Sequence, residues 1–191
     1  VAVPANARVM RFNIEDRLNV MRAEAEKSCF NRIEEGDKRI GIITCAVSYQ
    51  YVKEVFPEYS ILKLGFTNPL PTELVRKFAS MVEKVYVVEE LDPVLREAVI
   101  DAGVKVESYK TELAMMEQNV DRLRALRAEL LGEELASIVK PELPVLPVRP
   151  PVLCAGCSHR TVFYSLAKLK ATVSGDIGCY TLGCVAPLNA M

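Results

Sequence analysis

Apolar residues in this chain fall into short continuous runs separated by amphipathic stretches. Continuous runs of four to seven apolar residues are typical of strands in a parallel sheet that is covered on both faces. We expect four such strands, at residues 39–45, 60–64, 84–89 and 104–107. Helices between them would form right-handed βαβ crossovers. The pattern therefore predicts an α/β fold with an open, mostly parallel sheet and flanking helices.

Helical stripes occupy the segments around these runs. Residues 12–27 carry apolar side chains at helical spacing, which predicts a lead-in helix. The stripe consists of Ile14, Leu18, Met21 and Ala25. Residues 47–56 predict a helix that ends at Pro57. The charged segment 112–138 predicts a surface helix on the same domain, and its shared apolar face holds Leu123, Leu126 and Leu130.

Four residues mark where other helices begin and end. Thr72 is expected to be the N-cap of the helix that follows it. Asp92 and Pro93 are expected to open the next helix, with Asp92 as the N-cap and Pro93 at the first helical position. Gly103 stands where a glycine commonly ends a helix. These signals place one helix on each side of the third strand.

A proline-rich segment at residues 141–151 predicts the boundary between two domains. It holds five of the chain's eleven prolines, which restrict φ and favour an extended, semi-rigid linker. The expected organisation is a lead-in segment, a sheet domain with its trailing helix, the linker, and the start of a second α/β domain. Their ranges are 1–36, 37–140, 141–151 and 152–191.

The second domain is predicted to begin with one helix and one strand. Ser158 is expected to cap the helix, with Val162, Leu166 and Leu169 facing inward. Residues 171–174 predict a strand that leads directly into the turn 175–178, which contains two glycines. An open α/β sheet binds its ligand outside the carboxyl ends of its strands, so this turn is a candidate cofactor site.

Composition excludes several classes of function. The chain has 24 basic and 25 acidic residues among 191, with the two signs interspersed, so no net field favours nucleic acid or an anionic membrane. No apolar run approaches the roughly 20 residues of a membrane span. The amino end lacks a signal-peptide pattern. These features predict a cytoplasmic protein with reduced thiols.

The reactive side chains concentrate near the carboxyl end. Four of the six cysteines and the single histidine lie between residues 154 and 184. Spacing alone leaves four interpretations open: a thioredoxin-like pair of Cys154 and Cys157, a zinc site that adds Cys179 and Cys184, an iron-sulfur site that uses Cys154, Cys157, Cys179 and one more thiolate, or cysteines that only pack in a turn.

Two residues beside this motif are candidates for chemistry. His159 is a candidate catalytic residue, because a neutral imidazole near a cofactor can relay protons. The alternative is that it fills a turn and bonds a backbone carbonyl. Arg160 is a candidate partner of a diphosphate or carboxylate, and the alternative is a solvated arginine.

Two further pairs lie before the proline-rich linker. Glu89 and Glu90 end a strand at the edge where ligands bind, so a substrate or interdomain role is one interpretation, and one packed and one solvated carboxylate is the other. Cys29 and Cys45 are expected to be small buried residues.

Five segments of the chain, in order, resemble the α (large) subunit of indolepyruvate ferredoxin oxidoreductases. They are 48–55 (SYQYVKEV), 63–71 (KLGFTNPLP), 86–91 (YVVEEL), 149–160 (RPPVLCAGCSHR) and 175–183 (GDIGCYTLG). The resemblance covers nearly the whole chain, and the last two strings are the most specific. It implies that residues 37–110 are similar to the transketolase C-terminal-like domain, and that residues from about 152 begin a thiamine-diphosphate-binding domain.

The resemblance also implies an activity. Members of the family oxidatively decarboxylate arylpyruvates such as indolepyruvate to acyl-CoA, with thiamine diphosphate, Mg²⁺, coenzyme A and [4Fe-4S] clusters that pass electrons to ferredoxin. The expected partners are the β (small) subunit of the same enzyme, ferredoxin, coenzyme A and the arylpyruvate. The alternative from another class is a non-catalytic zinc-binding interaction module that uses Cys154, Cys157, Cys179 and Cys184.

The cofactor residues follow from matching positions. Asp176, Ile177, Gly178 and Cys179 match the strand-turn segment that lies against the thiamine cofactor in the family, where a glycine lets backbone N–H groups approach the diphosphate. Gly175 in the same turn is expected to contribute as well. Arg160 completes the expected cofactor-binding set.

The resemblance points to three metal ligands. In related 2-oxoacid ferredoxin oxidoreductases, the cysteines that correspond to Cys154, Cys157 and Cys179 bind the cluster nearest the thiamine. In the indolepyruvate branch the well-marked clusters lie in a carboxyl-terminal ferredoxin-like domain, so both placements stay open. Ser158 stands where the family usually has proline, and Cys184 where a small residue without a thiol is expected.

Parts of the expected catalytic apparatus fall outside this sequence. The glutamate on the pyrimidine side of the cofactor is expected to precede Val1, and the Mg²⁺ site and the ferredoxin-like cysteines are expected to follow Met191. The chain by itself is therefore predicted to be inactive.

Overall fold

The computed structural model describes residues 3–135 and 144–190, which form two compact units. The first unit comprises Val1–Ser137 and the second Ile138–Met191. The first unit holds a sheet and most of the helices, and the second holds one long helix and one short one.

The first unit follows an α/β order along the chain. Its elements are α1 (Pro4–Ala25), β1 (Arg32–Glu34), β2 (Asp37–Cys45), α2 (Ser48–Val55), β3 (Tyr59–Leu64), α3 (Thr72–Ser80), β4 (Lys84–Val88), α4 (Val94–Asp101), α5 (Thr111–Ala114) and α6 (Val120–Leu131). The strands form one sheet in the order β1-β3-β2-β4. Strands β2, β3 and β4 are mutually parallel, and β1 pairs antiparallel with β3. The predicted open, mostly parallel sheet is confirmed.

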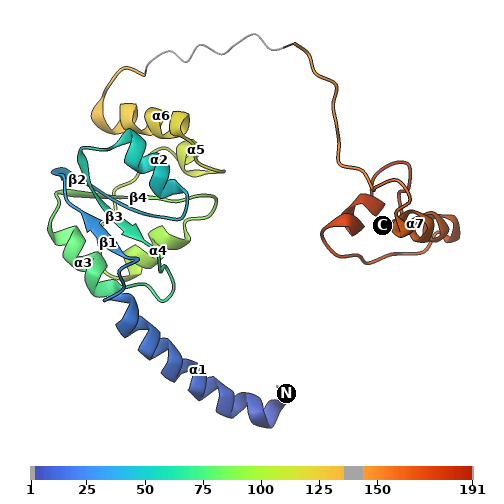
Figure 1. The fold of residues 1–191 in the computed structure, drawn as a ribbon, viewed down its shortest axis with the longest axis horizontal. Helices are drawn as coiled ribbons and strands as arrows, with labels where there is room; N and C mark the ends of the chain where they lie inside the picture. The colour runs from blue at the N-terminus through green and yellow to red at the C-terminus, as the bar shows by residue number, and fades with distance from the viewer. Residues whose placement is uncertain (1–2, 136–143, 191) are drawn as a thin grey trace. The chain divides into compact units, whose positions relative to one another are not determined.

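Helices cover both faces of this sheet (Figure 1). On one face, α2 and α6 pack against alternate residues of the strands, such as Ile42, Ile61 and Val88. On the other face, α3 and α4 pack against Ile43, Leu62 and Val87. Since successive side chains of a strand point to opposite faces, a continuous apolar strand supplies both cores. Neither face of the central strands is therefore exposed to solvent.

The strand predicted at 104–107 is absent, and a strand that was not predicted stands at the other edge. Glu107 donates one backbone N–H to the carbonyl of Val85 at 2.8 Å, so this segment runs beside β4 without a regular ladder. Strand β1 was missed because three residues are too few to show a period.

Helices α3 and α4 begin without the N-cap residues that the sequence predicts. Neither Thr72 nor Asp92 caps a helix, because the N-cap positions are the prolines that adjoin them. Instead, the Glu26 carboxylate accepts the first free N–H groups of α3, and the Glu89 carboxylate accepts those of α4. Gly103 follows the end of α4 with φ +84°, as predicted.

The lead-in helix α1 is longer than predicted, and its apolar stripe has little cover. Of its residues only Ala25 is buried, while Ile14 and Leu18 are half-exposed and Met21 is exposed. Within residues 3–135 and 144–190, no helix is long and apolar enough to cross a membrane.

The predicted helix over 112–138 is two helices, α5 and α6. The loop between them places Gln118 in the interior. Leu123 and Leu126 are buried as predicted, and Leu130 packs on the same core. Residues 136–138 of that prediction lie outside the described residues.

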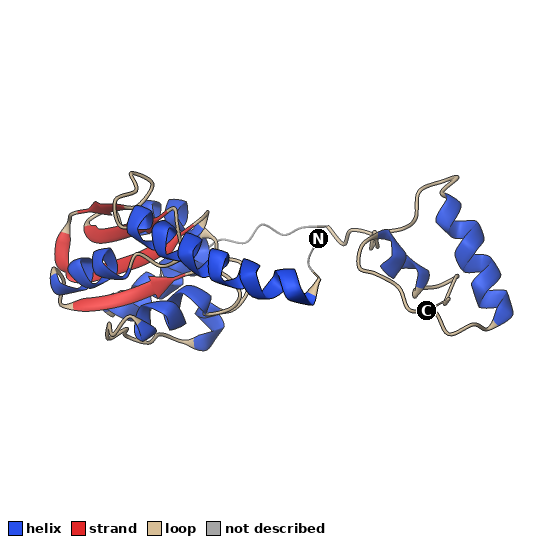
Figure 2. Ribbon diagram, turned by 90° about the horizontal axis from the view of Figure 1, so that it is seen from below, coloured by secondary structure: helices blue, strands red, loops and turns tan. Residues whose placement is uncertain are grey.

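The second unit contains helix α7 (Ser158–Leu169) and a short 3-10 helix, η1 (Cys179–Gly183) (Figure 2). Its small core consists of Leu153, Phe163 and Ala190. The prediction that Val162 and Leu169 face inward was wrong, because Phe163 is the buried residue of α7 and both others are exposed. Leu166 does pack against this core.

Two further expectations for the second unit were wrong. Cys157, not Ser158, occupies the N-cap position of α7. Residues 171–174 form no strand, since a strand requires a paired neighbour and the described part of this unit provides none. The predicted linker is described only from Pro144 onward, and residues 144–151 are exposed and extended.

Candidate functional site

The carboxyl edge of the sheet is where an open α/β fold offers a ligand site. The chain leaves β2 toward β3 on one side and returns to β4 on the other, so the strand order reverses between β2 and β4. Ligands bind in the crevice outside such a switch point. Cys45 ends β2 there, and Glu89 and Glu90 follow β4.

Both carboxylates at this edge bond to backbone. Glu89 accepts N–H groups of Leu95 and Arg96 at 2.7 and 2.8 Å, and Glu90 accepts that of Gln118 at 2.9 Å. Burial raises the pKa of Glu89 above its ordinary value of 4.5. Glu89 therefore holds the start of α4, and Glu90 holds the loop before α6. Both carboxylates bond to backbone N–H groups, which differs from the expected pair of one packed and one solvated carboxylate.

The thiols of the first unit differ from expectation. Cys29 is exposed, so its predicted burial was wrong, because it lies in the turn after α1. Cys45 is half-buried, and burial, with Glu89 and Glu90 nearby, raises the pKa of its thiol above 9.0. This environment disfavours the thiolate form of Cys45.

The cysteine motif of the second unit forms a turn before α7. The N–H of Cys157 donates to the carbonyl of Cys154 at 3.1 Å, and Gly156 between them has φ +75°. Cys154, Cys179 and Cys184 are exposed, and Cys157 is half-buried. Cys184 donates its thiol to the carbonyl of Thr181 at 2.8 Å.

The structure does not bring these thiols together as a metal site. Among the residues it describes, there is no group of three or more histidine, cysteine, aspartate or glutamate side chains placed to hold a metal ion. Cys154, Cys157 and Cys179 are not placed as one ligand set in this arrangement, and their assignment as iron-sulfur ligands stays a prediction. The same holds for the zinc site that would add Cys184.

His159 pairs with a cysteine and an aromatic ring. Its Nδ1 lies 3.5 Å from the Sγ of Cys157, and its ring centroid lies 4.8 Å from that of Tyr180. Among the described residues this imidazole makes no hydrogen bond to a backbone carbonyl, and its catalytic role stays a prediction. The contacts join the start of α7 to η1.

Arg160 points its guanidinium at the cysteine turn. Its Nε donates to the carbonyl of Cys154 at 3.0 Å, and its Nη2 donates to the carbonyl of Leu153. Those donors are engaged in holding the turn.

The predicted cofactor turn is exposed. Residues 175–179 all lie at the surface of the unit, and the N–H of Ile177 donates to the Oδ1 of Asp176 at 2.7 Å. Gly178 has φ +117°, and a Cβ placed there would meet no atom within 4 Å. The backbone at Gly178 leaves space for a diphosphate to approach. The N–H of Ile177 already donates to the side chain of Asp176.

A cavity of about 680 Å³ lies within the second unit, next to the core residue Leu153. Its lining is mainly apolar and comes from the proline segment, α7 and the residues after η1. Arg160 and Tyr164 contribute its polar atoms together with Thr161.

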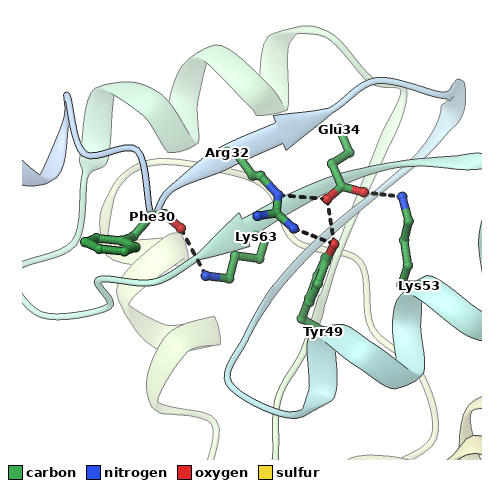
Figure 3. Close-up of polar contacts among 6 residues, drawn as sticks. All are labelled: Phe30, Arg32, Glu34, Tyr49, Lys53 and Lys63. Atoms are coloured by element: carbon green, nitrogen blue, oxygen red, sulfur yellow. Dashed lines mark hydrogen bonds and ion pairs between the residues drawn. The ribbon is translucent and has the colours of Figure 1, made fainter.

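One charged cluster escaped sequence reasoning altogether. Arg32, Tyr49 and Lys53 converge on the carboxylate of Glu34 (Figure 3). Burial alone would raise the pKa of Glu34, but the hydrogen bonds from these three residues lower it from 4.5 to about 2. The only local signal was the spacing of Tyr49 and Lys53 by four, which puts them on one face of α2.

Curated proteins of known name align with the whole length of this chain. No family model matches it. Indolepyruvate oxidoreductase subunits IorA from Methanothermobacter thermautotrophicus, Archaeoglobus fulgidus and Thermococcus kodakarensis are 36%, 35% and 36% identical to it, over alignments that cover all of this chain. The chain covers 34%, 34% and 33% of those three proteins, so it spans about a third of the length of its curated relatives.

Among solved structures, a 2-oxoglutarate:ferredoxin oxidoreductase from Magnetococcus marinus, with 2-oxoglutarate, coenzyme A and succinyl-CoA bound, matches with a TM-score of 0.44 and 18% identity. That match covers 65% of this chain and 24% of that one.

Over its whole length, the chain is similar in sequence to subunits of a 2-oxoacid oxidoreductase. More closely, these relatives are indolepyruvate oxidoreductase subunits IorA, at 34–36% identity. The predicted resemblance is confirmed.

Proposed function

We propose that the subunit containing this chain catalyses the oxidative decarboxylation of arylpyruvates such as indolepyruvate to acyl-CoA, with ferredoxin as electron acceptor. The observation that carries the proposal is the alignment of the entire chain with IorA subunits at 34–36% identity. The relatives are named as subunits, which supports assembly with a partner subunit. That this partner is the smaller β subunit, and that the complex lies in the cytoplasm, is part of the proposal. Thiamine diphosphate, when bound, supplies the carbanion chemistry that decarboxylation requires.

In this proposal the chain supplies a scaffold and part of the cofactor site. Gly175, Asp176, Ile177 and Gly178 would line the diphosphate, and the open backbone of Gly178 supports this role. A few backbone hydrogen bonds at roughly 1 kcal/mol each fall short of the about 8 kcal/mol that micromolar binding requires. Mg²⁺ and the remaining contacts therefore come from the rest of the subunit.

The contacts of the second unit suggest how its own residues act. Arg160 holds the cysteine turn through two backbone carbonyls, and His159 links that turn to η1 through Cys157 and Tyr180. Arg160 is then a positioning residue for the turn at Cys154, and His159 links that turn to Tyr180, the residue after Cys179. The assignment of Cys154, Cys157 and Cys179 as cluster ligands stays a prediction.

The proposal is tested with the full-length subunit assembled with its partner subunit without oxygen. Reduction of ferredoxin should depend on indolepyruvate, coenzyme A and thiamine diphosphate together. No reduction with any arylpyruvate would overturn it. The cluster assignment is tested separately with Cys157→Ser, and Cys184→Ser is the matched control because Cys184 lies outside the predicted set.

If Cys157 is a ligand, its replacement lowers iron content by about one cluster and slows ferredoxin reduction, while Cys184→Ser leaves both unchanged. Equal iron in the wild type and both variants would leave these cysteines as turn residues.

A further inference from the structure

A second cavity lies in the first unit, at the carboxyl ends of β2 and β3. It has a volume of about 550 Å³ and is lined mainly by polar atoms. Cys45 and Leu64, the last residues of those two strands, form its floor with the loops that follow them. Because the carboxyl ends of parallel strands share one edge of the sheet, this position is one where α/β folds bind ligands.

The cavity is positively charged. Arg32 and Lys63 both line it, and no lining residue in the described part of the chain is acidic. The two cations are direct partners across the β1–β3 ladder. Like charges placed opposite each other on a sheet repel, and this arrangement costs stability unless an anion lies between them.

Neighbouring carboxylates compensate this charge only in part. Glu34 bonds Arg32 through its Nε at 2.9 Å and also takes Lys53, so one carboxylate serves two cations. Lys63 donates to the backbone carbonyl of Phe30 at 3.1 Å, which carries no full charge (Figure 3). The cluster therefore keeps an excess of positive charge on the side that faces the cavity.

The same contacts orient the donors. The bond from Arg32 Nη2 to the hydroxyl of Tyr49, at 2.8 Å, fixes the plane of the guanidinium, whose Nη1 has no partner among the described residues. Gln50 and Thr67 add an amide and a hydroxyl to the lining. A fixed guanidinium beside an ammonium and neutral donors suits an anion with several oxygens, which describes phosphate better than a single carboxylate.

We propose that this cavity binds the phosphate group of a small phosphorylated molecule, with Arg32 and Lys63 as its charged contacts and Gln50 and Thr67 as neutral donors. The volume exceeds what one phosphate needs and falls within the range of about 300–1,000 Å³ for small-molecule sites, so the ligand carries an organic portion. The proposal concerns the first unit alone and does not depend on the reaction of the parent enzyme.

The test uses the 191-residue chain labelled with nitrogen-15 and titrated with inorganic phosphate at constant ionic strength, with chloride as the reference anion. The amide signals of Gln50, Gly65 and Thr67 should shift and saturate, while signals of the second unit stay in place. A parallel titration with adenosine monophosphate distinguishes a phosphorylated molecule from the free ion, because the organic portion should tighten binding.

The matched variants are Lys63→Gln and Lys53→Gln. Each removes one positive charge from the same cluster, but Lys53 does not line the cavity. Lys63→Gln should weaken phosphate binding about tenfold or more, which is about 1.4 kcal/mol, and Lys53→Gln by much less. Thermal unfolding of each variant checks that the fold is retained, and Arg32→Lys provides a second variant that keeps the charge but loses the planar fork.

Three outcomes would overturn the proposal: no saturable shift with phosphate or adenosine monophosphate, equal weakening by Lys63→Gln and Lys53→Gln, or shifts spread over both units. Tighter binding of free phosphate than of the monophosphate would also count against an organic ligand.

Discussion

Glu34 is the residue whose replacement tests the electrostatics of the first unit most directly. It lies on the edge strand β1 and accepts hydrogen bonds from Arg32, Tyr49 and Lys53. Glu34→Gln keeps the shape and one acceptor oxygen but removes the negative charge. The two cations then lose their common counter-charge, and we expect the free energy of unfolding to fall.

The size of the effect follows from the pKa of Glu34, which is about 2 against an ordinary value of 4.5. At about 1.4 kcal/mol for each pH unit of that difference, the charge contributes at most about 3 kcal/mol. The side chains of Arg32 and Lys53 are 52% and 48% exposed, so solvent screens the pairs. We therefore expect a loss of about 1–2 kcal/mol at neutral pH.

The contribution of Glu34 to the free energy of unfolding depends on pH, and its direction follows from the lowered pKa. A carboxylate with a lowered pKa in the folded state contributes stability above its unfolded pKa, and that contribution is lost as pH falls through the folded value. The difference between the wild type and Glu34→Gln should therefore be constant from about pH 8 to 5 and shrink between pH 4.5 and about 2.

The assay is urea unfolding of the chain across that range of pH, in low and high salt. Glu35→Gln is the matched control, because Glu35 is the exposed neighbour on the same strand end. It should change stability by less than about 0.5 kcal/mol. A loss in Glu34→Gln that does not change with pH would refute the electrostatic explanation and leave packing or hydrogen-bond geometry as the cause.

Two further predictions concern the sheet itself. Asn31→Ala should lower the free energy of unfolding by about 1–3 kcal/mol, because the buried Oδ1 of Asn31 accepts the N–H groups of Gly65 and the next residue, and urea unfolding measures the loss. Gly41→Ala should cost about 1–3 kcal/mol, since its Cβ would lie 2.6 Å from the Cγ2 of Val82 and 3.0 Å from the ring of Phe78. Adding Val82→Ala should recover part of that loss in the same assay, and no recovery would contradict the steric explanation.

The linear sequence determined the central sheet. Strands β2, β3 and β4 are continuous apolar runs, and such runs can be satisfied only between two layers of helices, so local pattern and tertiary environment agree. The cysteine motif was also evident from sequence, because it is defined by residue type and spacing. The resemblance to indolepyruvate oxidoreductase subunits followed from five segments of the sequence and not from hydrophobic periodicity.

Tertiary structure decided the features that depend on residues far apart in the chain. The carboxylate that caps α3 belongs to Glu26, which lies 47 positions before the first N–H it accepts, and no local rule can anticipate such a partner. The inward face of α7 was set by the small core around Phe163 and not by its apolar stripe, because several faces of that helix are apolar enough to be buried.

The charged cavity shows the same limit for function. Arg32 and Lys63 become neighbours only because β1 turns back antiparallel to β3, and a three-residue strand carries no periodic signal in sequence. Residue type therefore revealed where thiol chemistry is concentrated, whereas strand pairing alone brought two like charges together. The physical reason is that the hydrophobic pattern of a sequence indicates which side of a single helix or strand is buried. A binding site depends instead on which helices and strands pack next to one another.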